Sequence, residues 1–270
     1  MRQHRFCLLV LPLLVLLLLA PGAYADSYLG STLSSFAVLG GSSVTNTGAT
    51  TITGNVGVSP GTSITGSSTI TLTGVYDAAD SAAGTAQTQL TTAINTLLGL
   101  PTTTSLTGQN LGGMTLTAGV YTFSSSAQLT GALTLNAQGL NNQVFVFETG
   151  STLTTASASS VTIINPGTND AVYWVVGSSA TLGSGTSFEG NILADTSITL
   201  GSGATDSCGS VFASTGMVTL NNNTIAAGCE DSTVPAAVPE PGTLLLLGSG
   251  IIGLAARMRR ARARSAKILC

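Results

Sequence analysis

The sequence has little charge and few aromatic side chains: 7% of its 270 residues are charged and 5% are aromatic. No lysine, arginine or histidine occurs between Cys7 and Ala256, and all the acidic residues lie from Asp26 to Glu240. Neutralising the phosphates of a nucleic acid requires lysine or arginine, so this acidic middle argues against a nucleic-acid partner.

The same lack of reactive side chains argues against an enzyme. The middle of the chain offers no basic group for proton transfer or for stabilising an oxyanion. Its carboxylates are scattered, and it has one tryptophan, Trp174, for stacking on a sugar. The repeated Gly-Gly-x-Gly-x-Asp motif of calcium-binding solenoids is also missing. We therefore assign no catalytic residue, no metal site and no cofactor.

The first 25 residues have the three parts of a secretory signal peptide. Arg2 and Arg5 provide the positive start, an apolar segment follows over 7–20, and Ala23 and Ala25 form an A-x-A cleavage site. The sequence therefore predicts export and a mature chain that begins at Asp26. An uncleaved membrane anchor is the alternative, although the apolar segment is short for one.

The last part of the chain resembles the PEP-CTERM sorting signal of Gram-negative bacteria. Pro239, Glu240 and Pro241 precede a short apolar segment over 243–256, and an arginine-rich tail follows it. The resemblance implies that an exosortase-type enzyme removes the segment 238–270, after a linker over 231–237. It also implies an extracellular or cell-surface protein that is transiently anchored in the membrane. A permanent short anchor is the alternative.

Two cysteines, Cys208 and Cys229, lie outside the signal peptide and the tail. An even pair in an oxidising compartment predicts a disulfide, and two free buried thiols are the alternative. Their spacing is close to one turn of the repeat described next. We expect the bridge to hold the C-terminal coil, for which we expect no neighbour beyond it.

A Thr-Leu dipeptide recurs along the chain in steps of 18 to 20 residues, with one step of 29. The six positions are Thr115-Leu116, Thr134-Leu135, Thr152-Leu153, Thr181-Leu182, Thr199-Leu200 and Thr219-Leu220. A fixed period of this size predicts a solenoid. We expect three short strands and three turns in each coil, with the leucines stacked inside and the threonines facing outward. Extra loop around 165–169 explains the long step.

One segment, 77–98, has its apolar residues on one face of a helix. Asp77 is a predicted N-cap, and Gly99 followed by Pro101 predicts the end of the helix. We expect this helix to lie along the solenoid and to cover one of its apolar sides.

Five segments of the mature chain resemble the DUF3494-type ice-binding proteins of microbes. They are Phe36–Leu39, Val44–Gly48, Gly54–Gly61, Leu111–Tyr121 and Phe188–Ala194. The resemblance implies a right-handed, three-faced parallel β-helix over 26–230 with one long α-helix alongside. It also implies that a broad flat face adsorbs to ice. The segment Thr205–Ser210 departs from the Asn-Gly-Arg-Ala of many members and supplies Cys208.

A hydroxyl residue often lies three or four places before the repeated Thr-Leu, which predicts two ladders of hydroxyls on one flat side. The candidate ice-binding residues are Thr130, Thr134, Thr149, Thr152, Ser178, Thr181, Thr196, Thr199, Thr215 and Thr219. The alternative is that threonine merely suits an exposed strand. We therefore expect a secreted antifreeze protein that inhibits ice recrystallisation, or a structural or adhesive protein of the extracellular polysaccharide matrix without ice activity. The expected partners are an ice surface, an exosortase and extracellular polysaccharide.

Overall fold

The computed structural model describes residues 28–228. The predicted signal peptide, Cys229, the linker and the sorting signal lie outside the described residues. Within 28–228, no helix is both long and apolar enough to cross a membrane.

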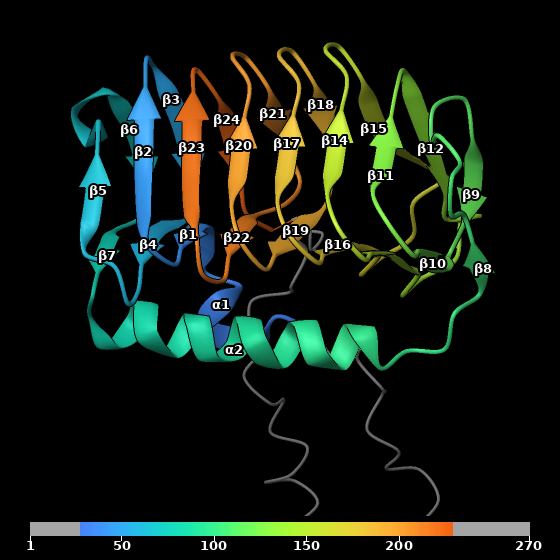
Figure 1. The fold of residues 1–270 in the computed structure, drawn as a ribbon, viewed down its shortest axis with the longest axis horizontal. Coiled ribbons are helices and arrows are strands. Elements are labelled where there is room, and N and C mark those ends of the chain that lie inside the picture. Colours follow the sequence, from blue (N-terminus) through green and yellow to red (C-terminus); the bar gives the residue numbers. More distant parts are fainter. Residues whose placement is uncertain (1–27, 229–270) are drawn as a thin grey trace, which may run out of the picture. The chain divides into compact units, whose positions relative to one another are not determined.

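The described chain is a three-sided β-solenoid in which every strand pairing is parallel, as the repeat predicted (Figure 1). We name its sides A, B and C. Sheet A has the order β7 (Tyr76–Ala78), β4 (Asn55–Val58), β1 (Phe36–Gly40), β22 (Val211–Ala213), β19 (Asn191–Ala194), β16 (Ala171–Val176), β13 (Val144–Thr149), β10 (Gly119–Phe123), β8 (Thr104–Ser105).

The other two sheets run beside it over the same coils. Sheet B is given from the end near β8, and sheet C from the end near β7. Sheet B consists of β11 (Ala127–Leu129), β14 (Leu153–Thr155), β17 (Ala180–Leu182), β20 (Ile198–Leu200), β23 (Met217–Asn221), β2 (Ser43–Thr47) and β5 (Ser63–Thr65). Sheet C consists of β6 (Ile70–Thr73), β3 (Thr50–Thr53), β24 (Thr224–Ala226), β21 (Thr205–Asp206), β18 (Ser187–Phe188), β15 (Ser160–Ile164), β12 (Ala132–Asn136) and β9 (Thr115–Thr117).

The path of the chain differs from a simple end-to-end stack. The first coils start inside the stack and run to the β7 end, where a short 3-10 turn (Ser67–Thr69) precedes β6. The helix α2 (Ser81–Leu98) then crosses to the β8 end, and the later coils return (Figure 1). The last coil therefore pairs with the first, as in Val38 with Val211 and Val44 with Val218. Our expectation that the C-terminal coil has no neighbour beyond it is wrong.

The leucines of the Thr-Leu repeat do face inward, but they occupy three registers, and Leu153 pairs with Ala127 and Ala180 rather than with another leucine. Leu116 pairs with Leu135 in sheet C, whereas Leu182 pairs with Leu200 in sheet B. The reason is coil length, because two coils carry extra loop between sheets C and A, over 137–143 and 165–170. That extra length moves the dipeptide from one sheet to the next. An aromatic spine also fills the core, with Phe147 and Trp174 stacked at a centroid distance of 4.0 Å.

The helix α2 lies along the outer side of sheet A, as predicted, but it begins later. Asp80 is the N-cap, and its carboxylate accepts a hydrogen bond from the Ala83 N–H at 2.9 Å. Asp77 belongs instead to β7, where it pairs with Gly57. The predicted stop is confirmed, since the helix ends at Leu98 and Gly99 is its C-cap.

Apolar packing holds α2 in place. Its buried residues meet outward side chains of sheet A, and together the cluster includes Leu90, Leu97, Phe36, Val146, Tyr173, Leu193 and Phe212. The short helix α1 (Gly30–Leu33) is fastened to the same element, because the Gln89 side-chain oxygen accepts hydrogen bonds from the Thr32 and Leu33 N–H groups. Sheet A is thus apolar on both sides and covered along its outer face.

Candidate functional site

The outward face of sheet B carries a continuous line of threonines, one from each of six adjacent coils. They pair strand to strand in perfect register, and we call them the threonine column: Thr154, Thr181, Thr199, Thr219, Thr45 and Thr65. Each side chain is exposed or half-buried. Gln128 takes the next place on the outermost strand, β11.

A second line of hydroxyls runs beside the first, two residues earlier on each strand. We call it the serine column: Ser126, Thr152, Ser179, Ser197, Ser43 and Ser63, with Met217 between Ser197 and Ser43. The Thr152 hydroxyl donates to the Ser126 hydroxyl at 2.9 Å, and the Ser197 Oγ accepts from the Met217 N–H at 3.3 Å. These contacts link neighbouring coils and hold the hydroxyls in line.

The two columns form a regular grid. Neighbouring strands lie about 4.8 Å apart, and residues two apart on a strand are separated by roughly 6.5–7 Å. None of the seven strands of sheet B contains a charged residue. Threonine is stiff about χ1, so each hydroxyl and methyl keeps a fixed direction. The face is therefore uncharged and repetitive, and its strands lie side by side along the stack (Figure 1).

A buried polar network at the corner between sheets B and C holds this face rigid. The Thr50 hydroxyl donates to the Asn46 side-chain oxygen at 2.6 Å, and the Asn223 N–H donates to the Thr50 hydroxyl at 3.2 Å. Further along, the hydroxyls of Thr155 and Thr186 are 2.9 Å apart. Buried groups that are satisfied in this way rigidify a core.

Four of the predicted ice-binding residues lie on this face: Thr152, Thr181, Thr199 and Thr219. Another four flank its strands. Ser178, Thr196 and Thr215 lie in the turns that lead from sheet A into sheet B, and Thr130 follows β11.

The remaining two predicted residues do not belong to this face. Thr134 lies on β12 of sheet C, and Thr149 ends β13 of sheet A with 5% of its surface exposed. The expectation that all ten share one side is wrong for these two. For Thr134 the cause is coil length, since the Thr-Leu dipeptide changes sheet where the coils are longer. Thr149 lies opposite Val176, two residues before Ser178. The reason is that Thr152 likewise lies two residues before the position of Thr181.

The dipeptide also missed half of the threonine column, namely Thr45, Thr65 and Thr154. A different signal marks them, because the strands of sheet B share a Ser/Thr–apolar–Thr tripeptide. It occurs as Ser43-Val44-Thr45, Ser63-Ile64-Thr65, Thr152-Leu153-Thr154, Ser179-Ala180-Thr181 and Ser197-Ile198-Thr199. In this tripeptide both flanking residues point outward and the middle one points into the core, as alternation on a strand requires.

Sheet C also carries outward threonines, but its face is less regular. Thr71, Thr51, Thr224 and Thr205 are in register. Beyond them β15 and β18 pair at one residue, Ser160 with Ser187. There the Glu189 carboxylate accepts the Ile163 N–H at 2.8 Å in place of a strand partner. Within residues 28–228, sheet B alone combines full register with the absence of charge and of a covering helix.

The one buried carboxyl of sheet C has no access to a substrate. The side chain of Asp206 points into the core beside Phe188 and Ile225, and it is fully buried. Burial raises the pKa of Asp206 well above its usual value, and the nearby Glu189 carboxylate raises it further. The nearby N–H groups of Cys208 and Gly190 lower the pKa in part. Burial therefore favours the protonated form of Asp206.

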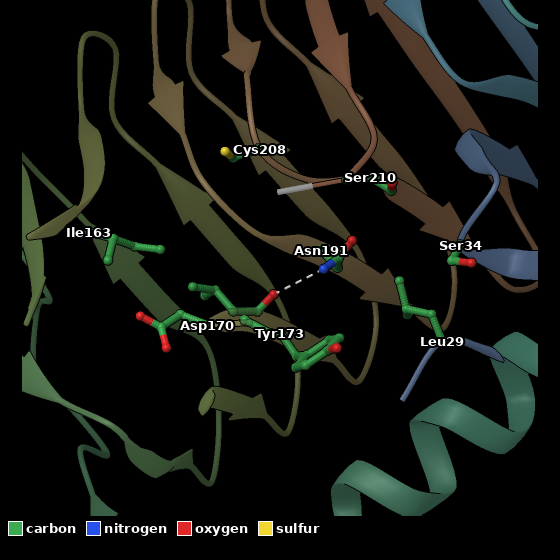
Figure 2. A pocket seen from close by; sticks show the side chains of 11 residues that line it. Leu29, Ser34, Ile163, Asp170, Tyr173, Asn191, Cys208 and Ser210 are labelled. Carbon is green, nitrogen blue, oxygen red and sulfur yellow. Dashed lines mark hydrogen bonds between the residues drawn. The ribbon is translucent and has the colours of Figure 1, made fainter. Parts of the chain in front are cut away.

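A small pocket of about 160 Å³ lies at the corner between sheets C and A, next to α1 (Figure 2). Polar groups that line it already make hydrogen bonds within the protein. The two carboxylate oxygens of Asp170 accept the N–H groups of Gln143 and Gly167, at 2.8 and 2.7 Å, and the Asn191 amide donates to the Val172 carbonyl. Among residues 28–228 no cluster of three or more metal-binding side chains occurs.

Comparison with known proteins agrees with this geometry. A model of the ice-binding-like family matches residues 38–226, and a model of the PEP-CTERM protein-sorting motif matches residues 237–260. An ice-binding protein of Nostoc sp. (strain HG1) is 50% identical over 240 residues, which cover 88% of each protein. An ice-binding protein of Colwellia sp is 32% identical, over 78% of this chain and 87% of that protein.

Solved structures give the same result. The crystal structure of an ice-binding protein from an Antarctic biological consortium has a TM-score of 0.69 and 41% identity, covering 73% of this chain and 89% of that one. The ice-binding protein of the Antarctic ascomycete Antarctomyces psychrotrophicus has a TM-score of 0.70 and 38% identity, covering 73% and 97%. The chain therefore belongs to the ice-binding-like family and carries a PEP-CTERM sorting motif.

Proposed function

We propose that this chain is an exported ice-binding protein that adsorbs to ice through the outward face of sheet B. The observation that carries the proposal is the threonine column, six threonines in register on adjacent coils with no charged residue on their strands. The membership of the chain in its family supports the same function. The work of such a protein is adsorption, with no chemical step and no enzymatic activity.

The physical basis is the match between the grid and a crystal. The spacing of strands, about 4.8 Å, is close to a repeat of the ice lattice. Stiff threonine methyl groups order the water above them, while the hydroxyls bond to that water. A charged side chain would hold its own hydration shell, and the strands of sheet B have none. Ordered water on the face then merges with the growing crystal and blocks its advance.

The test compares two tyrosine substitutions in residues 26–237. Thr199→Tyr places a bulky ring in the centre of the threonine column, and Thr152→Tyr does the same in the serine column. Thr51→Tyr is the control on sheet C, where the residue is exposed on a strand as Thr199 is, whereas Thr152 is half-buried. Inhibition of ice recrystallisation and thermal hysteresis are measured, together with the melting temperature.

We expect both sheet B variants to lose activity with an unchanged melting temperature, and the control to keep it. Full activity in Thr199→Tyr and Thr152→Tyr would exclude sheet B as the ice face. A wild-type chain without any ice activity would favour the alternative, a structural or adhesive protein of the extracellular polysaccharide matrix. The sorting motif is compatible with either function.

We further propose that the chain is secreted through its signal peptide and is released from a transient membrane anchor by an exosortase-type enzyme of a Gram-negative host. Pro239, Glu240 and Pro241 are the proposed sorting motif, and the family match over 237–260 supports it. The intact mass of protein from its native host should lack residues 1–25 and those beyond about 241. A mass that retains the arginine-rich tail would contradict processing.

The Cys208–Cys229 disulfide stays a prediction, since Cys229 lies outside the described residues. Cys208 lies in the turn between β21 and β22, at the junction where β22 pairs with β1. Closing a loop of about 20 residues would stabilise that junction by roughly 3 kcal/mol. Denatured, unreduced protein from an oxidising compartment should titrate with no free thiol, and two free thiols would refute the bridge.

A further inference from the structure

The serine column is interrupted at one place. Of the seven strands of sheet B, six have serine or threonine at this position, and β23 has Met217. Met217 is 43% exposed, so its side chain stands on the proposed ice face rather than in the core. It separates Ser43 and Ser63 on one side from the four hydroxyls on the other side.

We propose that Met217 limits the strength of ice adsorption, so that the face binds ice more weakly than it would with a hydroxyl residue at this position. This inference rests on the proposed function of sheet B. The threonine column is unbroken beside it, because Thr219 of the same strand pairs with Thr199 and Thr45. The defect is therefore confined to one side chain in one of the two columns.

The chemistry of methionine explains the effect. Its side chain is unbranched, with three rotatable bonds, and it fills space irregularly. It extends further from the strand than serine or threonine, so a flat crystal surface must either stand off from it or immobilise it. Immobilising a flexible side chain costs conformational entropy. A methionine here also removes the hydroxyl that would join Ser197 to Ser43.

The backbone at this position is already set for a hydroxyl residue. Met217 pairs in register with Ser43, and its N–H donates to the Ser197 hydroxyl at 3.3 Å. The next residue, Val218, is fully buried and fills the core. A serine at 217 would therefore repeat the Ser–apolar–Thr tripeptide of the neighbouring strands without changing the interior.

The experiment compares wild type, Met217→Ser and Met217→Leu in the same purified protein. Met217→Leu is the matched control, since it keeps a bulky apolar side chain at the same place. We expect Met217→Ser to inhibit ice recrystallisation at a severalfold lower concentration and to raise thermal hysteresis. We expect Met217→Leu to show no gain, and both variants to keep the wild-type melting temperature.

The outcomes separate this inference from the proposed function. An active wild type with an equal or weaker Met217→Ser variant overturns the role of Met217 and leaves sheet B in place. An inactive wild type with an active Met217→Ser variant supports it. If wild type and Met217→Ser are both inactive, the proposed function and this inference fail together. A gain in Met217→Leu equal to that in Met217→Ser would support the limit at Met217 and would assign it to the long, flexible side chain rather than to the missing hydroxyl.

Discussion

Sheets A and B belong to the same coils, yet the outward face of sheet A is covered by a helix and that of sheet B is exposed. The outward residues of sheet A are large and apolar, such as Phe36, Val146 and Phe212, and they lie beneath α2. Apart from Gln128 and Met217, the outward residues of the two columns of sheet B are small and hydroxylated, and no element covers them in the described part of the chain (Figure 1). The backbone is the same in both, so the outward side chains decide which face is closed and which is left to meet a partner.

The difference is also visible in the strand sequences. A strand that is buried on both sides has a nearly continuous apolar run, as Ala171–Val176 does. Strands of sheet B alternate instead, with one apolar residue between two hydroxyls. Stability should therefore depend mainly on sheet A with its helix, and activity mainly on sheet B.

The largest expected effect tests the stability of the covered face. Leu90 of α2 is fully buried in the cluster beneath the helix. Leu90→Ala should destabilise the protein by about 2–5 kcal/mol, because it removes apolar contacts and leaves a cavity. Thermal unfolding followed by circular dichroism measures the loss.

Ice activity gives the second half of this test. At low temperature, where the Leu90→Ala variant is still folded, its recrystallisation inhibition should equal that of wild type. A folded variant with reduced inhibition would mean that the helix contributes to the ice face, and the separation of the two faces would be wrong.

The sequence predicted the solenoid and its helix because both depend on local periodicity. It did not predict that β1 pairs with β22. A coil can stack equally well on coils before or after it in the chain, so the repeat carries no information about their order in space. The position of Asp77 was misjudged for a similar reason. Asp77 lies in β7 and pairs with Gly57 of β4, and this long-range pairing outweighs its preference for capping a helix.

The candidate site was predicted in part. Thr181, Thr199 and Thr219 share a sheet because their coils are short and nearly equal in length. Across the longer coils the same dipeptide changes between sheets C and B, and only the strand register reveals which other residues complete the threonine column. Met217 stands out for that reason in the structure alone, since a lone methionine has no meaning until its neighbours in the column are known.

A smaller effect is expected from the interior of sheet C, where one inward position holds a carboxyl instead of an apolar group. Burial raises the pKa of Asp206, so the folded protein keeps its proton at pH values where the unfolded chain releases it. Stability is then greatest below the ordinary aspartate pKa of about 3.9 and falls as the pH rises toward the folded value. The buried group thus weakens the fold at neutral pH.

The neutral substitution Asp206→Asn should remove this loss. We expect the variant to be more stable than wild type at pH 7, and the difference to shrink toward pH 4 as the wild-type carboxyl becomes protonated in both states. Urea unfolding at several pH values measures it. Part of the dependence of stability on pH should persist in the variant, because burial also raises the pKa of Glu189 and Glu148. A difference between variant and wild type that is the same at every pH would contradict the titration of Asp206.

The smallest expected effect comes from replacing one hydroxyl on the outward face of sheet B by an apolar group, as on the outward face of sheet A. Thr181→Val keeps the branched shape and the stiffness about χ1 but replaces the hydroxyl by a methyl group, as on the covered face. Thr181→Ser keeps the hydroxyl and loses the stiffness. Both should change the free energy of unfolding by less than about 0.5–1 kcal/mol, because Thr181 is exposed. If a rigid, evenly shaped surface is what orders water, Thr181→Val should retain more recrystallisation inhibition than Thr181→Ser. The opposite ranking would mean that hydrogen bonding by the hydroxyl dominates. An apolar face like that of sheet A would then not bind ice even if no helix covered it.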